Sequence, residues 1–128
     1  MRILIVDDSS VVREIVETAL RHLGLELHDV LHAANGQQGI AALTLAETRG
    51  ETLDLILCDV HMPVMNGLDF LLERARLKLA LGVPVAMITA DATDPDLLRA
   101  ISAGAQGHIA KPFTLQQMQT QVLFLISA

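Results

Sequence analysis

The chain has 128 residues, of which 52% are apolar, so it is long enough for one folded domain and too apolar for a disordered segment. Its net charge of −6 argues against a nucleic-acid-binding surface, which needs clustered Lys and Arg, and favours a cation as a partner. A single cysteine, Cys58, excludes an internal disulfide, and we recognise no signal peptide or membrane span, so we expect a cytoplasmic protein.

Short apolar runs alternate with segments of helical period along the chain. The alternation predicts strands at 3–6, 28–33, 53–59, 84–89 and 106–110, each followed by a helix: Val12 to Leu23 with a stop at Gly24, then 37–48, 66–80, Asp94 to Gly104, and a last helix that opens at Thr114. Five such units with short connections predict an α/β fold, a five-stranded parallel doubly wound sheet flanked by five helices. We expect one domain, spanning residues 1–128.

Apolar residues at helical spacing define the helix faces that we expect to be buried. They are Val12, Ile15, Val16, Ala19, Leu20 and Leu23 in the first helix, Leu68, Leu71, Leu72, Ala75 and Leu79 in the third, and Leu115, Met118, Val122 and Leu125 in the last. The last helix leaves Leu123, Phe124 and Ile126 partly outward. These three residues indicate either a surface that packs on a partner or a sequence cut from a longer protein.

The functional site of a doubly wound sheet lies beyond the carboxyl ends of its strands, near the switch in strand order. Polar residues gather at these positions in the chain: Asp7 and Asp8 after the first strand, Asp59 after the third, Thr89 after the fourth and Lys111 after the fifth. We therefore expect these five side chains to form one site.

Three carboxylates at neighbouring strand ends repel one another unless a cation lies between them. A hard divalent ion such as Mg²⁺, or Mn²⁺ in its place, prefers oxygen ligands, so Asp7, Asp8 and Asp59 predict a metal site. The alternative for Asp7 and Asp8 is that they only cap the first helix. Asp59 is ionised at neutral pH and could attack a phosphoryl group without a general base, and its alternative is to serve as a third metal ligand.

Lys111 and Thr89 complete the predicted site. The Lys111 ammonium could pair with Asp59 at rest and with phosphoryl oxygens after transfer, although an ordinary surface lysine is the alternative. Pro112 favours a turn directly after the strand, which would direct Lys111 inward. The Thr89 hydroxyl could donate a hydrogen bond to a phosphoryl oxygen, although Thr is also common in strands for its β propensity alone.

Four segments, in this order, resemble the motifs of response-regulator receiver domains of bacterial two-component systems. They are Val6-Asp7-Asp8-Ser9-Ser10, Asp59-Val60-His61-Met62-Pro63-Val64-Met65-Asn66-Gly67, Thr89-Ala90 and Lys111-Pro112-Phe113. The resemblance covers essentially the whole chain and implies a flavodoxin-like (CheY-like) fold in which Asp59 takes a phosphoryl group from a histidine kinase or phosphotransfer protein. Within the family, the segments look most like stand-alone chemotaxis-type regulators.

The resemblance also implies individual ligands and a partner surface. Asp8, Asp59 and the backbone carbonyl of His61 would bind Mg²⁺, with Asp7 acting through water. The fifth strand and the last two helices would form the surface that dimerises or binds a downstream protein. The segment 41–53 is longer than receivers usually have before the third strand, and we expect an extended loop at residues 48–52.

Further implications concern the phosphoryl group and the switch that follows its transfer. Thr89 and Lys111 would contact the phosphoryl group, and the Lys111–Pro112 peptide bond would be cis. Receivers typically carry Tyr or Phe three residues before this lysine, as a side chain that rotates inward, whereas this chain has His108. We expect His108 either to act as a rotating switch with weaker apolar packing or to be a partly exposed histidine on an edge strand.

Several functions remain open at this point. The leading prediction is a phosphorylation-controlled binding module, which is not an enzyme beyond self-catalysed phosphoryl transfer and autodephosphorylation, and which binds neither nucleic acid nor a membrane. The alternatives are a receiver fragment of a larger regulator or hybrid kinase, a scaffold that no longer accepts phosphate, and a small phosphatase-like enzyme. The sequence has no phosphate-binding glycine loop and no lid insertion, which argues against the enzyme.

Overall fold

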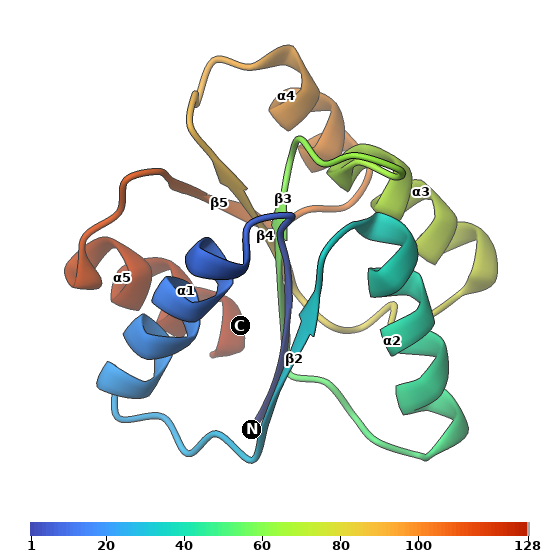
Figure 1. The fold of residues 1–128 in the computed structure, drawn as a ribbon, viewed down its shortest axis with the longest axis horizontal. Helices are drawn as coiled ribbons and strands as arrows, with labels where there is room; N and C mark the ends of the chain where they lie inside the picture. The colour runs from blue at the N-terminus through green and yellow to red at the C-terminus, as the bar shows by residue number, and fades with distance from the viewer. Residues whose placement is uncertain (128) are drawn as a thin grey trace.

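A computed structural model of the protein describes residues 1–127 and contains the five strands and five helices that the sequence predicts (Figure 1). In chain order they are β1 (Arg2–Val6), α1 (Ser10–His22), β2 (Asp29–Ala33), α2 (Gly36–Thr48), β3 (Leu55–Asp59), α3 (Gly67–Leu77), β4 (Val85–Thr89), α4 (Pro95–Ser102), β5 (Gly107–Ala110) and α5 (Leu115–Ile126). All strand pairs are parallel, and the order in the sheet is β2-β1-β3-β4-β5. The predicted α/β fold with a doubly wound sheet is therefore confirmed.

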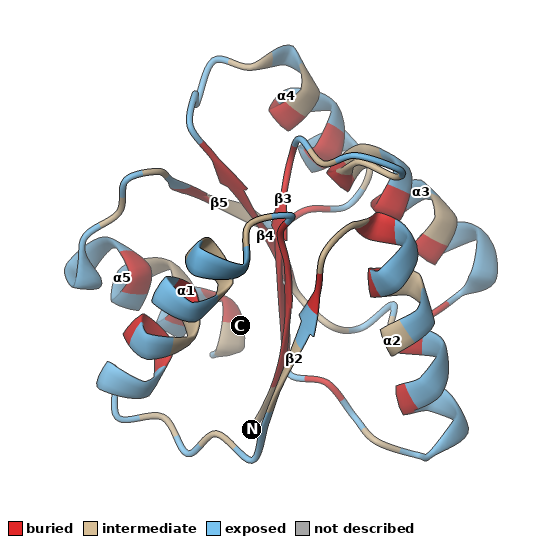
Figure 2. Cartoon of the chain, in the orientation of Figure 1, coloured by how far each residue is buried: buried red, intermediate tan, exposed pale blue. Residues whose placement is uncertain are grey.

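Helices enclose the sheet on both sides, with α1 and α5 on one face and α2, α3 and α4 on the other (Figure 1). Because both faces are covered, every residue of the central strands β3 and β4 is buried, which explains their continuous apolar runs. The edge strands β2 and β5 are partly exposed (Figure 2). The strand order reverses between β1 and β3, the position at which doubly wound sheets bind their ligands.

The first helix begins directly after the two acidic residues of the β1–α1 loop. Its N-cap is Ser9, whose hydroxyl accepts a hydrogen bond from the Val12 N–H at 3.2 Å. Gly24 follows the helix with a φ of +75°, which glycine adopts without strain, as predicted. Because Ser9 caps the helix, the interpretation of Asp7 and Asp8 as its capping residues is wrong.

The predicted buried faces of three helices include residues that the structure exposes. Ile15, Leu72 and Leu115 are each 52% exposed. Leu115 opens α5 and precedes its first buried residue, Met118. A helix that lies on a sheet buries only a stripe of its surface, and apolar spacing alone does not show where the edges of that stripe fall.

The third helix ends at Leu77, before the predicted end at Ala80. The Arg74 side chain is buried, and its Nη2 donates to the carbonyl oxygens of Ala80 at 2.6 Å and Val83 at 2.8 Å. Ala75, which we predicted to be buried, is exposed. A charged side chain that satisfies loop carbonyls can occupy an interior position, and a search for apolar residues does not find it.

The last two helices begin as predicted. Asp94 caps α4 and accepts a hydrogen bond from the Asp96 N–H at 2.9 Å, while Pro95 occupies the first turn. Thr114, at which we predicted the last helix to open, forms a capping box with Gln117 at the start of α5. These local signals place the two helices that flank β5.

Part of the apolar surface of α5 faces solvent. Leu123 and Phe124 are exposed, as predicted, whereas Ile126 packs partly buried against the core between the sheet, α1 and α5. Within residues 1–127, no helix is both long enough and apolar enough to cross a membrane.

The loop between α2 and β3 covers residues 49–54. Asp54 accepts a hydrogen bond from the backbone N–H of Arg2 at 2.8 Å, which places the loop at the amino edge of the sheet. The predicted extended loop is therefore present, and it lies at the opposite edge from the strand ends that carry the candidate site.

Candidate functional site

The carboxyl ends of four strands bring the predicted polar side chains to one edge of the sheet. Asp7 and Asp8 follow β1, Asp59 ends β3, Thr89 ends β4 and Lys111 follows β5. Asp7, Asp8 and Asp59 each offer a carboxylate oxygen within 4.8 Å of those of the other two. The Nζ atom of Lys111 lies 3.0 Å from Oδ2 of Asp7 and 3.4 Å from Oδ2 of Asp59. The three carboxylates and the lysine therefore form one cluster.

Hydrogen bonds from three elements hold Asp7 in place. Its N–H donates to the carbonyl oxygen of Ala33 in β2 at 3.0 Å, and its Oδ1 accepts from the Ser9 N–H at 2.9 Å. Its Oδ2 accepts from Lys111, and the residue is only 1% exposed. The shorter ion pair of Lys111 is thus with Asp7, whereas we predicted Asp59 as its partner at rest.

Burial and neighbouring charge both change the pKa of Asp59. Burial, and next the charge of Asp7, raise the pKa of Asp59 above its ordinary value, and these effects outweigh the attraction of Lys111. Burial alone would lower the pKa of Lys111, but its contacts with Asp7 and Asp59 outweigh burial and raise it. One ammonium group therefore does not neutralise the carboxylates that surround it.

The composition of this cluster fits a divalent cation. Carboxylate oxygens are the ligands that Mg²⁺ and Mn²⁺ prefer, and a single ion would relieve the repulsion that raises the pKa of Asp59. Each of the three carboxylates has an oxygen near enough to those of the other two for one ion to lie between them. Asp8 is exposed, so the cluster is open to solvent on one side.

Thr89 is buried at the end of β4, and its hydroxyl bonds within its own loop. Oγ1 donates to the carbonyl oxygen of Asp91 at 3.0 Å and accepts from the Asp91 N–H at 3.1 Å. The hydroxyl therefore belongs to the β4–α4 loop in this structure. On the other side of the cluster, the Lys111–Pro112 peptide bond is cis, as the resemblance implies.

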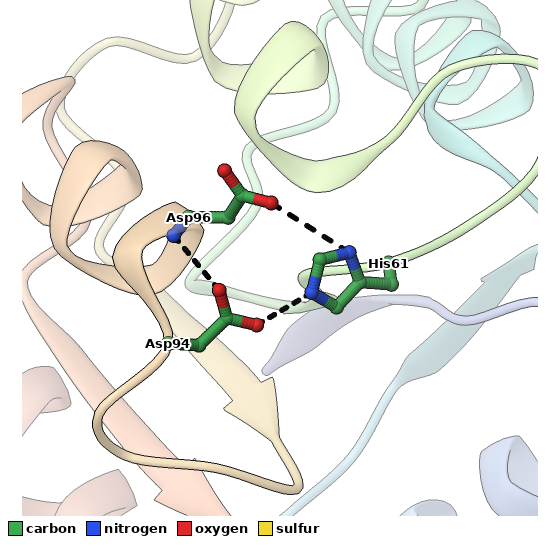
Figure 3. A group of neighbouring side chains, drawn as sticks. All are labelled: His61, Asp94 and Asp96. Atoms are coloured by element: carbon green, nitrogen blue, oxygen red, sulfur yellow. Dashed lines mark hydrogen bonds and ion pairs between the residues drawn. The ribbon is translucent and has the colours of Figure 1, made fainter.

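The side chain of His61 points toward Asp94 and Asp96 at the start of α4 (Figure 3). Its Nε2 lies 2.5 Å from Oδ2 of Asp94, and its Nδ1 lies 3.9 Å from Oδ2 of Asp96. The hydrogen bond to Asp94 is the main cause that raises the pKa of His61, and the same bond lowers the pKa of Asp94. Because each ring nitrogen faces a different carboxylate, we interpret this group as an ion-pair network that ties the β3–α3 loop to α4.

His108 lies on the edge strand β5 and is partly exposed. It lines a groove between β5 and α5 together with Thr114, Gln117 and Gln121. The expected placement on an edge strand is confirmed, and its role as a switch stays a prediction.

Two features of the site were not predicted from the sequence. The first is the bridge from His61 to Asp94 and Asp96, which joins segments that are distant in sequence. The second is Arg13, whose Nη1 donates to the carbonyl oxygen of Asp7 at 2.5 Å. The position of Arg13 one turn into the helix that follows the acidic pair was a signal that could have pointed to it.

Comparison with known proteins agrees with this geometry. A family model described as the response regulator receiver domain matches residues 3–123. The chain is 35% identical over 122 residues to the chemotaxis protein CheY1 of Helicobacter pylori, an alignment that covers 95% of this chain and 94% of that protein. Among solved structures, the Vibrio cholerae chemotaxis protein CheY4 superposes with a TM-score of 0.79 at 28% identity, covering 97% of both chains.

A further solved structure contains a metal. It is the receiver domain of a sensor histidine kinase from Pseudomonas aeruginosa, with a magnesium ion coordinated in its active-site cleft. It has a TM-score of 0.81 and 31% identity to this chain, and the alignment covers 99% of this chain and 98% of that one. The chain therefore belongs to the response regulator receiver family, the receiver domains of two-component phosphorelays. Its similarity to CheY-type proteins extends over nearly their whole length.

Proposed function

We propose that the protein accepts a phosphoryl group on Asp59 from a histidine kinase or a phosphotransfer protein. The observation that best supports this role is the position of the Asp59 carboxylate, 3.4 Å from Lys111 and grouped with two further carboxylates at the carboxyl edge of the sheet. Burying uncompensated carboxylates costs stability, so a purely structural ion pair does not account for this excess of negative charge. A site that binds a cation and receives a phosphoryl group does account for this excess of negative charge.

Mg²⁺, or Mn²⁺ in its place, is the proposed cofactor. Asp8, Asp59 and the backbone carbonyl of His61 would be its ligands, with Asp7 acting through a water molecule. When bound, the ion would neutralise the carboxylates and screen the incoming phosphoryl group from their charge. The magnesium ion in the similar Pseudomonas receiver domain supports this assignment.

In the transfer step, an oxygen of the Asp59 carboxylate forms a bond to phosphorus while the bond from phosphorus to the donor nitrogen breaks. The carboxylate must be ionised to attack, and Lys111 favours the ionised form because it lowers the pKa that burial raises. After transfer, Lys111 would donate to a phosphoryl oxygen. Thr89 would exchange its hydrogen bond with Asp91 for one to the phosphoryl group, which would move the β4–α4 loop.

The response to phosphorylation is proposed to reach the surface formed by α4, β5 and α5. Exposed apolar side chains on these elements include Leu98, Ile101 and Phe124. Solvent-facing apolar groups of this kind favour binding of a downstream protein or of a second copy of the chain. His108, in the groove between β5 and α5, is the proposed switch residue that connects this surface to Thr89.

The similarity to CheY-type proteins supports a cytoplasmic, stand-alone regulator of chemotaxis type in which residues 1–128 form one domain. In such a regulator, phosphorylation is stoichiometric and self-catalysed, and no phosphorylated metabolite is turned over.

The test is to incubate the protein with Mg²⁺ and acetyl phosphate and to measure its intact mass. We expect one phosphoryl adduct on the wild type and none on Asp59→Asn. No adduct on the wild type, or an equal adduct on the variant, would refute the proposal. Asp96→Asn, on α4 outside the carboxylate cluster, is the matched control and should still form the adduct. Sustained release of phosphate from excess donor at enzyme-like rates would instead support the phosphatase class.

A further inference from the structure

A chain of polar side chains runs from the acidic β1–α1 loop across α1 to β2. Arg13 on α1 donates from Nη1 to the carbonyl oxygen of Asp7 at 2.5 Å, and from Nε to Nδ1 of His32 at 3.2 Å. The Nε2 atom of His32 lies 2.7 Å from Oε1 of Glu17. Glu17 also accepts hydrogen bonds from Arg21, one helical turn further along α1. The guanidinium of Arg13 thus joins the acidic loop to the edge strand β2.

The carbonyl that Arg13 contacts belongs to the peptide group between Asp7 and Asp8. The Asp7 side chain has its own hydrogen bonds to Ser9 and Lys111. Asp8 directly follows this peptide group, so the orientation of the peptide affects the direction in which the Asp8 side chain leaves the backbone. A group that fixes this peptide therefore influences where both carboxylates of the acidic pair stand.

Arg13 is itself held in one arrangement. A guanidinium group only donates hydrogen bonds, so Nδ1 of His32 must be the acceptor in their contact. The ring hydrogen of neutral His32 then lies on Nε2, from which it donates to Glu17. The two neighbours thus select one tautomer of His32, and His32 in turn orients the long Arg13 side chain.

From its charge alone, Arg13 is expected to weaken the binding of a cation at the carboxylate cluster. A positive group beside a cation site repels the cation, so its presence should weaken binding unless it also organises the ligands. The two-point contact with the Asp7 carbonyl and His32 is a geometry that organises the loop. The sign of the effect on cation affinity therefore distinguishes charge from geometry.

We propose that Arg13 is a positioning residue that holds the Asp7–Asp8 peptide in the orientation in which the carboxylates bind a divalent cation, with His32 holding Arg13. This inference rests on the proposed metal-dependent phosphorylation of Asp59. It assigns a function to a part of α1 that lies outside the carboxylate cluster.

The experiment compares Arg13→Gln, Arg13→Lys and Arg21→Gln with the wild type. Mg²⁺ affinity is measured by titration calorimetry, because the chain has no Trp or Tyr to report binding by fluorescence. We expect Arg13→Gln to weaken Mg²⁺ binding about tenfold, at the lower end of the effect that the loss of a group orienting metal ligands has. Arg13→Lys keeps the charge but cannot make both contacts, so it should weaken binding by about twofold to threefold.

Arg21→Gln is the matched control because it removes the same charge from the same helix, while its guanidinium bonds to Glu17 and not to the acidic loop. It should stay within about twofold of the wild type. Mg²⁺ binding to Arg13→Gln that is as tight as or tighter than in the wild type would overturn the inference. So would equal weakening in Arg13→Gln and Arg21→Gln.

A second measurement separates positioning from general loss of structure. The rate of phosphorylation by acetyl phosphate is followed as a function of Mg²⁺ concentration for each variant. In Arg13→Gln the Mg²⁺ concentration for half-maximal rate should rise by the same factor as the dissociation constant measured by calorimetry. The rate at saturating Mg²⁺ should stay within about twofold of the wild type. A fall in the saturated rate without a shift in the Mg²⁺ requirement would contradict positioning. If the wild type neither binds Mg²⁺ nor forms the adduct, the proposed function itself fails.

Discussion

The carboxylate cluster and the groove between β5 and α5 differ in how tightly their residues are packed. At the cluster, a Cβ added to Gly67 would come within 2.3 Å of the Asp59 carbonyl oxygen, which is backbone. At the groove, a Cβ added to Gly107 would meet the side-chain Oε1 of Gln121 at 2.9 Å, and that side chain can move. The backbone beside Asp59, the proposed phosphoacceptor, is therefore tightly packed, whereas a side chain at the surface proposed to carry the output can move aside.

Replacing a glycine by alanine in each of the two regions tests this contrast and should give the biggest change in stability. Gly67→Ala should destabilise the protein by about 3 kcal/mol or more, because the backbone of Asp59 and Val60 cannot make room for the methyl group. Gly107→Ala should change stability by less than about 1 kcal/mol, because only a flexible side chain must move. Urea denaturation of both variants measures the difference, and equal destabilisation would remove the contrast.

The second prediction concerns the positive charge within the cluster. Lys111→Ala should lower the free energy of unfolding by about 2 kcal/mol at pH 7, since two carboxylates lose their counter-charge and the partial exposure of the lysine limits the cost. Mg²⁺ should restore part of the loss. Urea denaturation with and without Mg²⁺ tests this expectation. In an Asp59→Asn background the same substitution should cost less, and an unchanged cost would show that Lys111 and Asp59 are not coupled.

A smaller effect, with a defined pH dependence, is expected for Asp59→Asn without a metal. The raised pKa of Asp59 means that the folded protein binds this proton more tightly than the unfolded chain does. The contribution of Asp59 to stability therefore falls as pH rises from about 4 through the raised pKa. The variant should be more stable than the wild type at pH 7, by about 1 kcal/mol.

The measurement for Asp59→Asn is denaturation across the range from about pH 4 to pH 8, where the gain should shrink toward the acidic end. Asp8→Asn is the matched control, because Asp8 is exposed, and it should change stability less. A variant that is less stable than the wild type at neutral pH would show that the ion pair with Lys111 outweighs burial.

The last prediction concerns a substitution in the groove between β5 and α5, which should affect the chemistry of the carboxylate cluster least. His108→Ala should leave the rate of phosphorylation within about twofold of the wild type, because His108 lines the groove between β5 and α5 and lies outside the ion pairs of the cluster. It should reduce the change in hydrogen exchange that phosphorylation causes over residues 107–121. If that change is the same in His108→Ala as in the wild type, His108 is not the switch.

The order of the elements could be predicted from the amino-acid sequence, as could the edge of the sheet at which Asp59 and Lys111 meet. Alternating strands and helices impose a parallel sheet, and a residue that ends a strand of such a sheet must lie at its carboxyl edge whatever the details of packing. Local signals likewise predicted where helices begin, as at Asp94 and Thr114, because a helix cap depends on residues that are near one another in the chain.

The partner that each side chain takes became clear only from the packing of the folded protein. Lys111 lies closer to Asp7 than to Asp59 by a few tenths of an ångström, and Arg13 reaches both the acidic loop and His32 on another strand. These contacts depend on how separate elements pack against one another, and the periodicity of residues along one element does not predict that packing. The chemistry available at the strand ends could therefore be predicted, whereas the contacts that hold it in place could not.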